Sequence, residues 1–230
     1  MKIALNACCI YREDWSLSAH GIFEEGIHLV SGDVGSGKTS LALVLAGLLK
    51  PSSGSVERDQ ISSLMVSFQF PEHHVTGATV RDECESWGVD PSAITEAAHL
   101  ADKADVPPLR MSRGELKRLN LACVLAGGYD LLVLDEPFSS LDCREKERIC
   151  QEISLRKKGI TIIFTHEPVI FPRVDYIWEI ANGSLQGRGS PPGALYSWEH
   201  APALIKKMIA GGKVPENISP ADILEAACRT

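Results

Sequence analysis

Residues Gly32–Ser40 read G-D-V-G-S-G-K-T-S, which matches the phosphate-binding loop pattern G-x-x-x-x-G-K-[ST]. The loop follows the apolar run 27–30 and precedes a helical stretch, 41–49. Glycines let backbone N–H groups turn toward an anion, and a helix N-terminus adds partial positive charge. We therefore expect a nucleotide's phosphates to be bound by Gly32, Gly35, Ser36, Gly37, Lys38, Thr39 and Ser40, with Lys38 on the outer phosphates and the Thr39 hydroxyl on Mg²⁺.

The composition is that of a soluble globular protein. The chain has 230 residues, 44% hydrophobic and 23% charged, enough for one domain with a small appended part. A net charge of −7 argues against a general affinity for nucleic acid. The longest apolar run, 41–49, is too short to cross a bilayer, and the short run 3–10 reads as a strand rather than a secretory signal.

The cysteines predict no metal site and no disulfide framework. There are seven, without a C-x-x-C pair or zinc-type spacing to histidines: Cys8, Cys9, Cys84, Cys123, Cys143, Cys150 and Cys228. Scattered free thiols in a chain of this size fit a reducing cytosol.

Two continuous apolar runs indicate buried strands of a parallel sheet. Residues 131–134 end in Asp135-Glu136-Pro137, and residues 160–164 end in Thr165-His166. Ligands of open parallel sheets collect at the carboxyl ends of the strands. Because the phosphate loop and both polar endings fall at such ends, the pattern predicts an α/β fold with one shared site. Residues 176–186 read as a hairpin with a two-residue turn, and 200–228 as helices.

The pair Asp135-Glu136 has the Walker B arrangement. A carboxylate at position 135 can hold Mg²⁺ opposite Thr39, and Glu136 can polarise the attacking water. Adjacent residues at a strand end point in different directions, so the two carboxylates can serve metal and water separately.

Ser112 and Asp142 each have both a structural and a functional interpretation. Ser112 and Glu115 form the capping-box pattern S-x-x-E before an amphipathic stretch, and that alone explains the serine. Asp142 with Glu145 repeats the pattern before a helix expected over 143–158.

With these residues in view, the chain resembles the nucleotide-binding subunit of ABC transporters over nearly its whole length. Met111–Glu115 stands where that family has L-S-G-G-Q. The resemblance implies a head-to-tail dimer that sandwiches two Mg·ATP, with this segment closing over the partner's nucleotide. It also implies roles for further residues: Ser112 and Gly114 in the signature, Gln69 as the Q-loop glutamine near Mg²⁺, Asp142 in the D-loop, His166 as the switch histidine, and Tyr11 (or alternatively Trp15) stacked on adenine.

A narrower resemblance is to the ATPases of energy-coupling factor (ECF) importers of vitamins and transition-metal ions. It rests on Phe68–Glu72, Thr79–Glu83 and a C-terminal stretch with Gly211–Pro215 and Ser219–Leu224. The resemblance implies an ABC ATPase domain over 1–190 with a small antiparallel β part and a short helical subdomain near 71–128, then a helical extension over 191–230. It further implies a homodimer or heterodimer, an integral membrane partner, and a peripheral position on the cytoplasmic face of the membrane.

Three other functions are alternatives to this resemblance. They are the ATPase of a different ABC importer, a soluble ABC ATPase without a transport role, and a P-loop kinase or GTPase. A GTPase lacks support because no guanine-selecting N-K-x-D is present, and a kinase lacks support because kinases do not carry the signature and D-loop segments. The chain also departs from the ABC pattern: Met111, Arg113 and Glu115 replace leucine, glycine and glutamine, and the segment 88–111 is short for the family. These departures leave open whether both sites of a homodimer would hydrolyse ATP equally.

Overall fold

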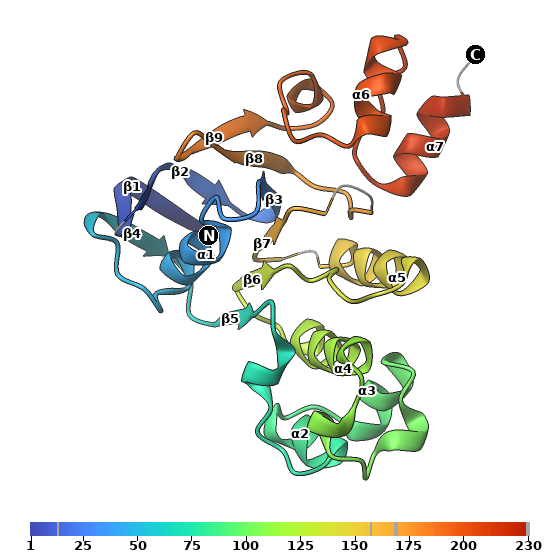
Figure 1. Ribbon diagram of the computed structural model, residues 1–230. Coiled ribbons are helices and arrows are strands. Elements are labelled where there is room, and N and C mark those ends of the chain that lie inside the picture. The colour runs from blue at the N-terminus through green and yellow to red at the C-terminus, as the bar shows by residue number, and fades with distance from the viewer. Residues whose placement is uncertain (13, 157, 168–169, 229–230) are drawn as a thin grey trace.

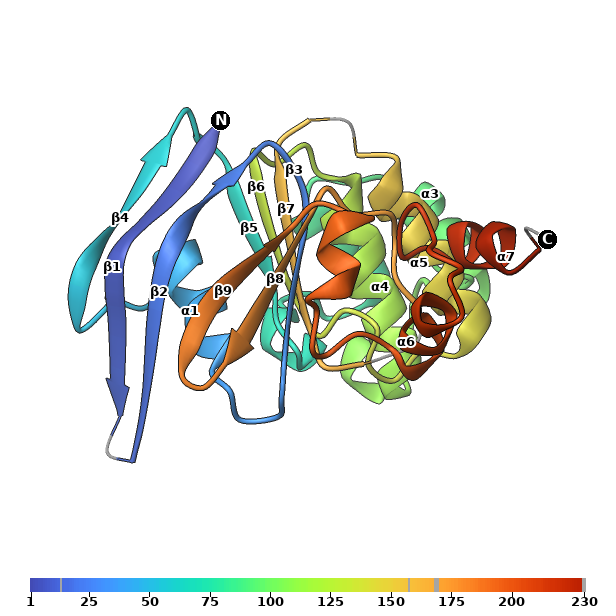
Figure 2. The same cartoon turned by 90° about the horizontal axis from the view of Figure 1, so that it is seen from above.

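One large mixed sheet forms the centre of the protein. The computed structural model describes residues 1–12, 14–156, 158–167 and 170–228. Within them the strand order is β4-β1-β2-β9-β8-β3-β7-β6-β5. The bounds are β1 Lys2–Arg12, β2 Trp15–Glu24, β3 Gly26–Gly32, β4 Ser53–Asp59, β5 Leu64–Ser67, β6 Leu131–Asp135, β7 Ile160–Thr165, β8 Tyr176–Ala181 and β9 Ser184–Gly189. Strands β8, β3, β7, β6 and β5 run parallel, whereas β1, β2 and β4 pair antiparallel and project to one side (Figure 2). This arrangement confirms the predicted α/β class.

The helices fall into separate groups along the sheet. Their bounds are α1 Lys38–Ala46, α2 Val80–Ser86, α3 Pro91–Ala97, α4 Arg113–Ala126, α5 Cys143–Ser154, α6 Ala203–Ala210 and α7 Pro220–Cys228. Helices α2, α3 and α4 lie together at one end of the molecule, and α6 and α7 lie at the opposite end (Figure 1). None of the helices in the described ranges combines the length and the apolar character needed to span a bilayer.

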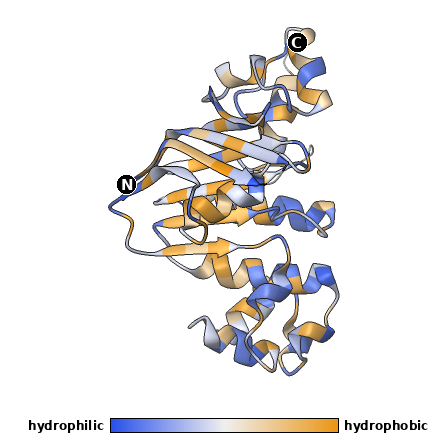
Figure 3. Cartoon of the chain, turned by 60° about the vertical axis from the view of Figure 1, so that its left-hand side comes forward, coloured by the Kyte–Doolittle hydropathy of each residue, from blue (hydrophilic) through white to orange (hydrophobic). Residues whose placement is uncertain are grey.

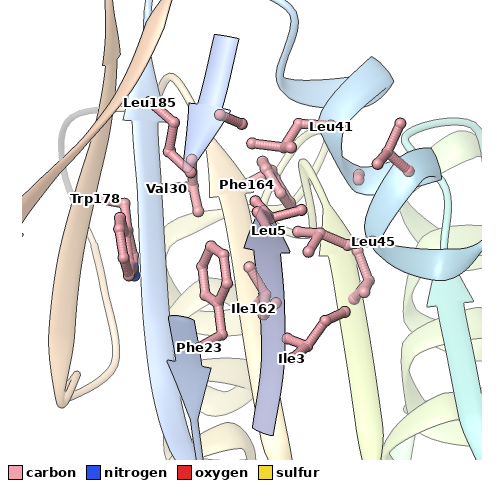
Figure 4. Close-up of a cluster of buried hydrophobic side chains, with 14 of the residues drawn as sticks. Ile3, Leu5, Phe23, Val30, Leu41, Leu45, Ile162, Phe164, Trp178 and Leu185 are labelled. Carbon is pink, nitrogen blue, oxygen red and sulfur yellow. The ribbon is translucent and has the colours of Figure 1, made fainter. Parts of the chain in front are cut away.

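Two apolar layers cover the two faces of the parallel strands. Because successive side chains of a strand point to opposite faces, Val133 enters one layer and Leu134 the other. The first layer lies between the sheet, helix α1 and the inner faces of β1 and β2, with Ile3, Phe23 and Leu41 among its members (Figure 4). The second layer packs against α5 and the C-terminal helices. Figure 3 shows the central strands as mostly apolar and the helices as amphipathic.

The helices around α4 have a small core of their own. It contains Val80, Cys84, Leu116, Leu119 and Cys123. Capping boxes start α2 at Thr79 and α4 at Ser112. The helices of this part therefore pack mainly on one another around a core separate from the two layers of the sheet.

Some element boundaries differ from the sequence-based expectation. Helix α1 ends at Ala46 rather than near Leu49, because Gly47 takes a left-handed φ of 77° and its N–H bonds back to the carbonyls of the last turn. Helix α5 ends at Ser154, short of the expected Lys158. The predicted hairpin is confirmed, with Asn182 and Gly183 at φ 50° and 68°, as a type I′ turn requires.

Candidate active site

The phosphate loop connects β3 to α1 at the carboxyl end of the sheet. Gly37 stands at the start of α1 with φ 99°, a conformation that favours glycine. A Cβ atom at this position would lie 2.0 Å from the Trp15 ring, so the indole packs directly against the backbone of Gly37. A side chain at position 37 would therefore displace Trp15 or the loop.

Lys38 is almost fully buried beneath the loop. Its Nζ donates hydrogen bonds of 2.8 Å to the carbonyl oxygens of Gly32 and Asp33. Burial lowers the pKa of Lys38, and the nearby carboxylates of Glu136 and Asp135 oppose that shift. The ammonium group is thus held inside the loop, where incoming phosphate oxygens could replace the two carbonyls.

Thr39 and Asp135 meet across the start of α1 and the end of β6. Thr39 Oγ1 donates a 2.7 Å hydrogen bond to Asp135 Oδ2. Asp135 Oδ1 is buried and has no hydrogen-bond partner among the described residues, and burial raises the pKa of this carboxyl. A hydroxyl beside a carboxylate with a free oxygen is a donor set that suits Mg²⁺, which prefers oxygen ligands.

Glu136 is fixed by three donors from the end of β7. Its Oε1 accepts hydrogen bonds from the His166 backbone N–H at 3.1 Å and from His166 Nδ1 at 2.6 Å, and its Oε2 accepts one from Thr165 Oγ1 at 3.0 Å. The Glu136 backbone lies in the left-handed region at φ 48°, which is uncommon for a residue other than glycine. This strained turn aims a carboxylate at the cavity rather than back into the sheet.

Gln69 follows β5 in a segment held by buried polar groups. Lys117 Nζ, from α4, donates to the carbonyl of Phe68 at 3.1 Å and to that of Gln69 at 3.4 Å. His74 Nε2 accepts the Phe68 N–H at 3.0 Å, and its ring stacks on the Phe68 ring. Burial lowers the pKa of Lys117 to about 8 and that of His74 to about 4. The position of Gln69 is therefore tied to α4.

Lys38, Thr39, Gln69, Glu136 and His166 line one cavity of about 290 Å³, whereas Asp135 and Lys117 lie behind its wall. Its lining combines the loop, the end of β1, the start of β2 and the polar strand ends: Arg12, Trp15, Val34, Gly35, Gly37, Lys38, Thr39, Ser40, Gln69, Glu136 and His166. The cations Arg12 and Lys38, the hydroxyl groups of Thr39 and Ser40, and the Glu136 carboxylate therefore line the same cavity.

Comparisons with known proteins agree with this geometry. The sequence profile of the family described as "ABC transporter" matches residues 19–139. The chain belongs to the ABC transporter family. It is 34% identical to the energy-coupling factor transporter ATP-binding protein EcfA1 of Thermotoga maritima, over 83% of this chain and 82% of that protein. It is 36% identical to the cytochrome c biogenesis ATP-binding export protein CcmA of Novosphingobium aromaticivorans, over 65% of this chain and 78% of that one.

A solved structure shows the same fold. A bacterial Atm1-family ABC exporter with ATP bound superimposes with a TM-score of 0.73 at 19% identity, over 92% of this chain. The chain spans 42% of that exporter's length. The comparisons confirm the predicted family and fold class, and the chain is an ABC-type ATPase.

Tyr11, which was predicted to stack on adenine, lies away from the cavity of this ABC ATPase. The Tyr11 side chain is 61% exposed and does not line the cavity, whereas Trp15 does. Strand alternation explains this, because the buried Ile10 and the cavity-lining Arg12 occupy one face of β1 and Tyr11 the other. The structure therefore places Trp15, the alternative to Tyr11, as the aromatic side chain beside this cavity.

The signature and D-loop residues of this ABC ATPase lie outside the cavity. Ser112 Oγ accepts the Glu115 N–H as the cap of α4, and Asp142 Oδ1 accepts the Glu145 N–H at 2.9 Å as the cap of α5. A Cβ on Gly114 would lie 3.0 Å from the Ser140 carbonyl oxygen, so the signature segment contacts the D-loop. These contacts agree with the structural interpretation of Ser112 and Asp142 as helix caps.

Several residues at the site were not predicted from the sequence. Arg12 and Val34 line the cavity, and Lys117 holds the Q-loop. Lys117 could have been found from the sequence, because it is a cation between Leu116 and Leu119 on the side of α4 that packs inward. Arg12 could not, because its place at the cavity depends on how the end of β1 lies relative to the loop.

Proposed function

We propose that this chain is the ATP-hydrolysing subunit of an ECF-type importer of a vitamin or a transition-metal ion. The observation that carries the proposal is Glu136, held by Thr165 and His166 at the edge of a cavity that also presents Lys38 and Thr39. The ECF assignment is supported by the identity to EcfA1 over most of both chains.

The site residues have distinct roles in this proposal. Lys38 would exchange its two carbonyl acceptors for the outer phosphates, and Trp15 would stack on adenine. Thr39 and Asp135 would hold Mg²⁺, with Gln69 nearby, and the ion would supply charge neutralisation at the phosphates. Glu136 would accept a hydrogen bond from the attacking water, and the donors on its carboxylate would keep it oriented while His166 approaches the γ-phosphate.

The proposed working form is a head-to-tail dimer, with an identical or a homologous partner. Ser112, Gly114 and Asp142 would contribute to the nucleotide site of the other subunit, which is supported by their position outside this subunit's cavity. The dimer would act on an integral membrane subunit at the cytoplasmic face of the membrane. The units proposed are an ATPase domain over 1–190, with its helical subdomain near 71–128, and an extension over 191–230.

Two experiments test this proposal. Purified protein should hydrolyse ATP with Mg²⁺, and Lys38→Ala should abolish nucleotide retention because Lys38 is the cation that the loop itself contributes to the cavity. In cells the chain should fractionate with membranes and leave them with a membrane protein when detergent is added. Undiminished ATP retention by Lys38→Ala would overturn the proposal.

A second candidate function is the ATPase of another ABC system. The similarity to a protein named as a cytochrome c biogenesis exporter subunit supports it. Identification of the membrane protein that co-purifies separates the two candidates, because an ECF transmembrane component and an exporter permease differ in sequence.

A further inference from the structure

We propose that the C-terminal extension holds the phosphate loop in position through Trp198 and His200. Both would be positioning residues for ATP binding, so the inference rests on the proposed function of the loop. The extension returns to the sheet after β9, before α6 and α7 begin (Figure 1).

Trp198 anchors the strand that leads into the loop. Its indole Nε1 donates a 2.7 Å hydrogen bond to Ser31 Oγ, and Ser31 Oγ donates in turn to the Trp178 carbonyl at 3.2 Å. Ser31 directly precedes Gly32, the first residue of the loop. All three side chains are buried, and Ser31 and Trp198 also line the small cavity beside the loop.

His200 links a buried carboxylate of the sheet to the loop itself. Its backbone N–H donates at 2.6 Å to Glu179 Oε1, and its Nδ1 donates to the same oxygen. Its Nε2 lies 3.2 Å from Asp33 Oδ1, in the loop. Each ring nitrogen therefore faces a carboxylate, one on β8 and one on the loop.

Glu179 is a firm anchor for this link. It is fully buried, and its Oε2 accepts a 2.6 Å hydrogen bond from Arg188 Nε on β9. Burial alone would raise the pKa of Glu179, but the donors of His200 and Arg188 outweigh it and lower that pKa. The carboxylate thus stays ionised and keeps the imidazole turned toward Asp33.

The loop depends on these bonds because it is not close-packed on this side. A cavity of about 170 Å³ separates the loop from the extension, and its lining includes Asp33, Val34, His166, Phe171, Trp198 and His200. The Asp33 carbonyl also accepts the Lys38 ammonium, so a shift of Asp33 would move the cation that binds phosphate.

Loss of the link would lower the fraction of molecules with a binding-competent loop. Apparent affinity falls in proportion to that fraction, whereas a molecule that has bound ATP keeps its catalytic groups. The expected kinetic effect is therefore a fall in ATP affinity without an equal fall in kcat.

The test is a double-mutant cycle on the full chain with Mg·ATP as the probe. For His200→Ala we expect the dissociation constant and KM for Mg·ATP to rise about 3- to 10-fold, with kcat within about twofold. This is the effect of losing one ordinary hydrogen bond, because the exposure of Asp33 to water weakens its attraction to His200. Asp33→Asn should act in the same direction, and the double variant should be no weaker than the worse single variant.

Arg173→Gln is the matched control. It removes the 2.6 Å ion pair of Arg173 with Asp222, which also joins the extension to the body of the protein. Arg173 lines a cavity with Gly26, at the start of β3 and thus at the other end of that strand from the loop. Its effect on ATP affinity should be under about twofold.

The inference is overturned if His200→Ala binds Mg·ATP as the unaltered protein does, or if the two single effects multiply in the double variant. Should His200→Ala fail to fold, Asp33→Asn decides alone, because the Asp33 side chain is 87% exposed and its change does not disturb the core. If Lys38→Ala loses Mg·ATP binding as expected but His200→Ala binds Mg·ATP as the unaltered protein does, this inference is overturned and the proposed function stands. Failure of the unaltered protein to retain Mg·ATP overturns both.

Discussion

Glu136 Oε1 and His166 Nδ1 lie 2.6 Å apart, so the residue after β6 and the residue after β7 share one hydrogen bond. The contact joins two neighbouring parallel strands at their carboxyl ends. It places a carboxylate and an imidazole on the same side of the phosphate loop, where both line the cavity.

The first prediction concerns hydrolysis. Glu136→Gln keeps the size of the side chain and one acceptor oxygen but removes the charge that would polarise water. We expect kcat to fall about 10²- to 10⁴-fold with ATP affinity retained, and an ATP-bound dimer to accumulate. Gel filtration with light scattering in ATP and Mg²⁺ checks the dimer. Elution as a monomer under these conditions would contradict the predicted mechanism.

The second prediction concerns the metal. Thr39→Ala removes the hydroxyl that bonds to Asp135 Oδ2, and with it one oxygen proposed for Mg²⁺. The Mg²⁺ concentration for half-maximal ATPase activity should rise about tenfold. Thr39→Ser keeps the hydroxyl and should stay within about threefold of the unaltered protein. Equal Mg²⁺ requirements for the alanine and serine variants would argue against a role of this oxygen in metal binding.

The third prediction concerns the base of the nucleotide. Trp15→Ala should weaken ATP binding about tenfold, since stacking of a base on an aromatic ring contributes about 1–3 kcal/mol. Trp15→Phe should recover most of that affinity, and Tyr11→Ala serves as the control with an expected change under about twofold. Titration with a fluorescent ATP analogue measures all three variants. A larger loss in Tyr11→Ala than in Trp15→Ala would restore the original choice of Tyr11.

The fourth prediction concerns acid stability. Burial lowers the pKa of His74 from 6.5 to about 4 in the folded protein. Between these values the unfolded chain binds a proton that the folded chain does not, so stability falls as pH drops from 6.5 to 4. The contribution is at most about 3 kcal/mol, and we expect about half of that because the ring is partly exposed.

Urea unfolding at a series of pH values checks this contribution. His74→Asn should lose less stability between pH 6.5 and 4 than the unaltered protein. His73→Asn is the matched control, because His73 is an exposed neighbour that touches Phe68 only edge-on and does not accept its backbone N–H. Parallel pH profiles for His74→Asn and the unaltered protein would contradict the assignment.

Local patterns sufficed for much of this protein. The phosphate loop, the apolar runs of β6 and β7 and the polar residues after them are contiguous in sequence, and the carboxyl ends of parallel strands meet by the geometry of the sheet. The helix starts at Ser112 and Asp142 also depend on residues three positions apart. These features could be predicted because the interactions that form them are short in sequence.

The tertiary structure decided which distant residues reach the site. Trp15 rather than Tyr11 covers the loop because the β1–β2 hairpin turns one face of its strands toward α1. Lys117 reaches the Q-loop across 49 positions to Phe68, and Trp198 reaches Ser31 across 167. Such contacts depend on how the sheet twists and how the extension returns along it, and no periodicity of the sequence records that path.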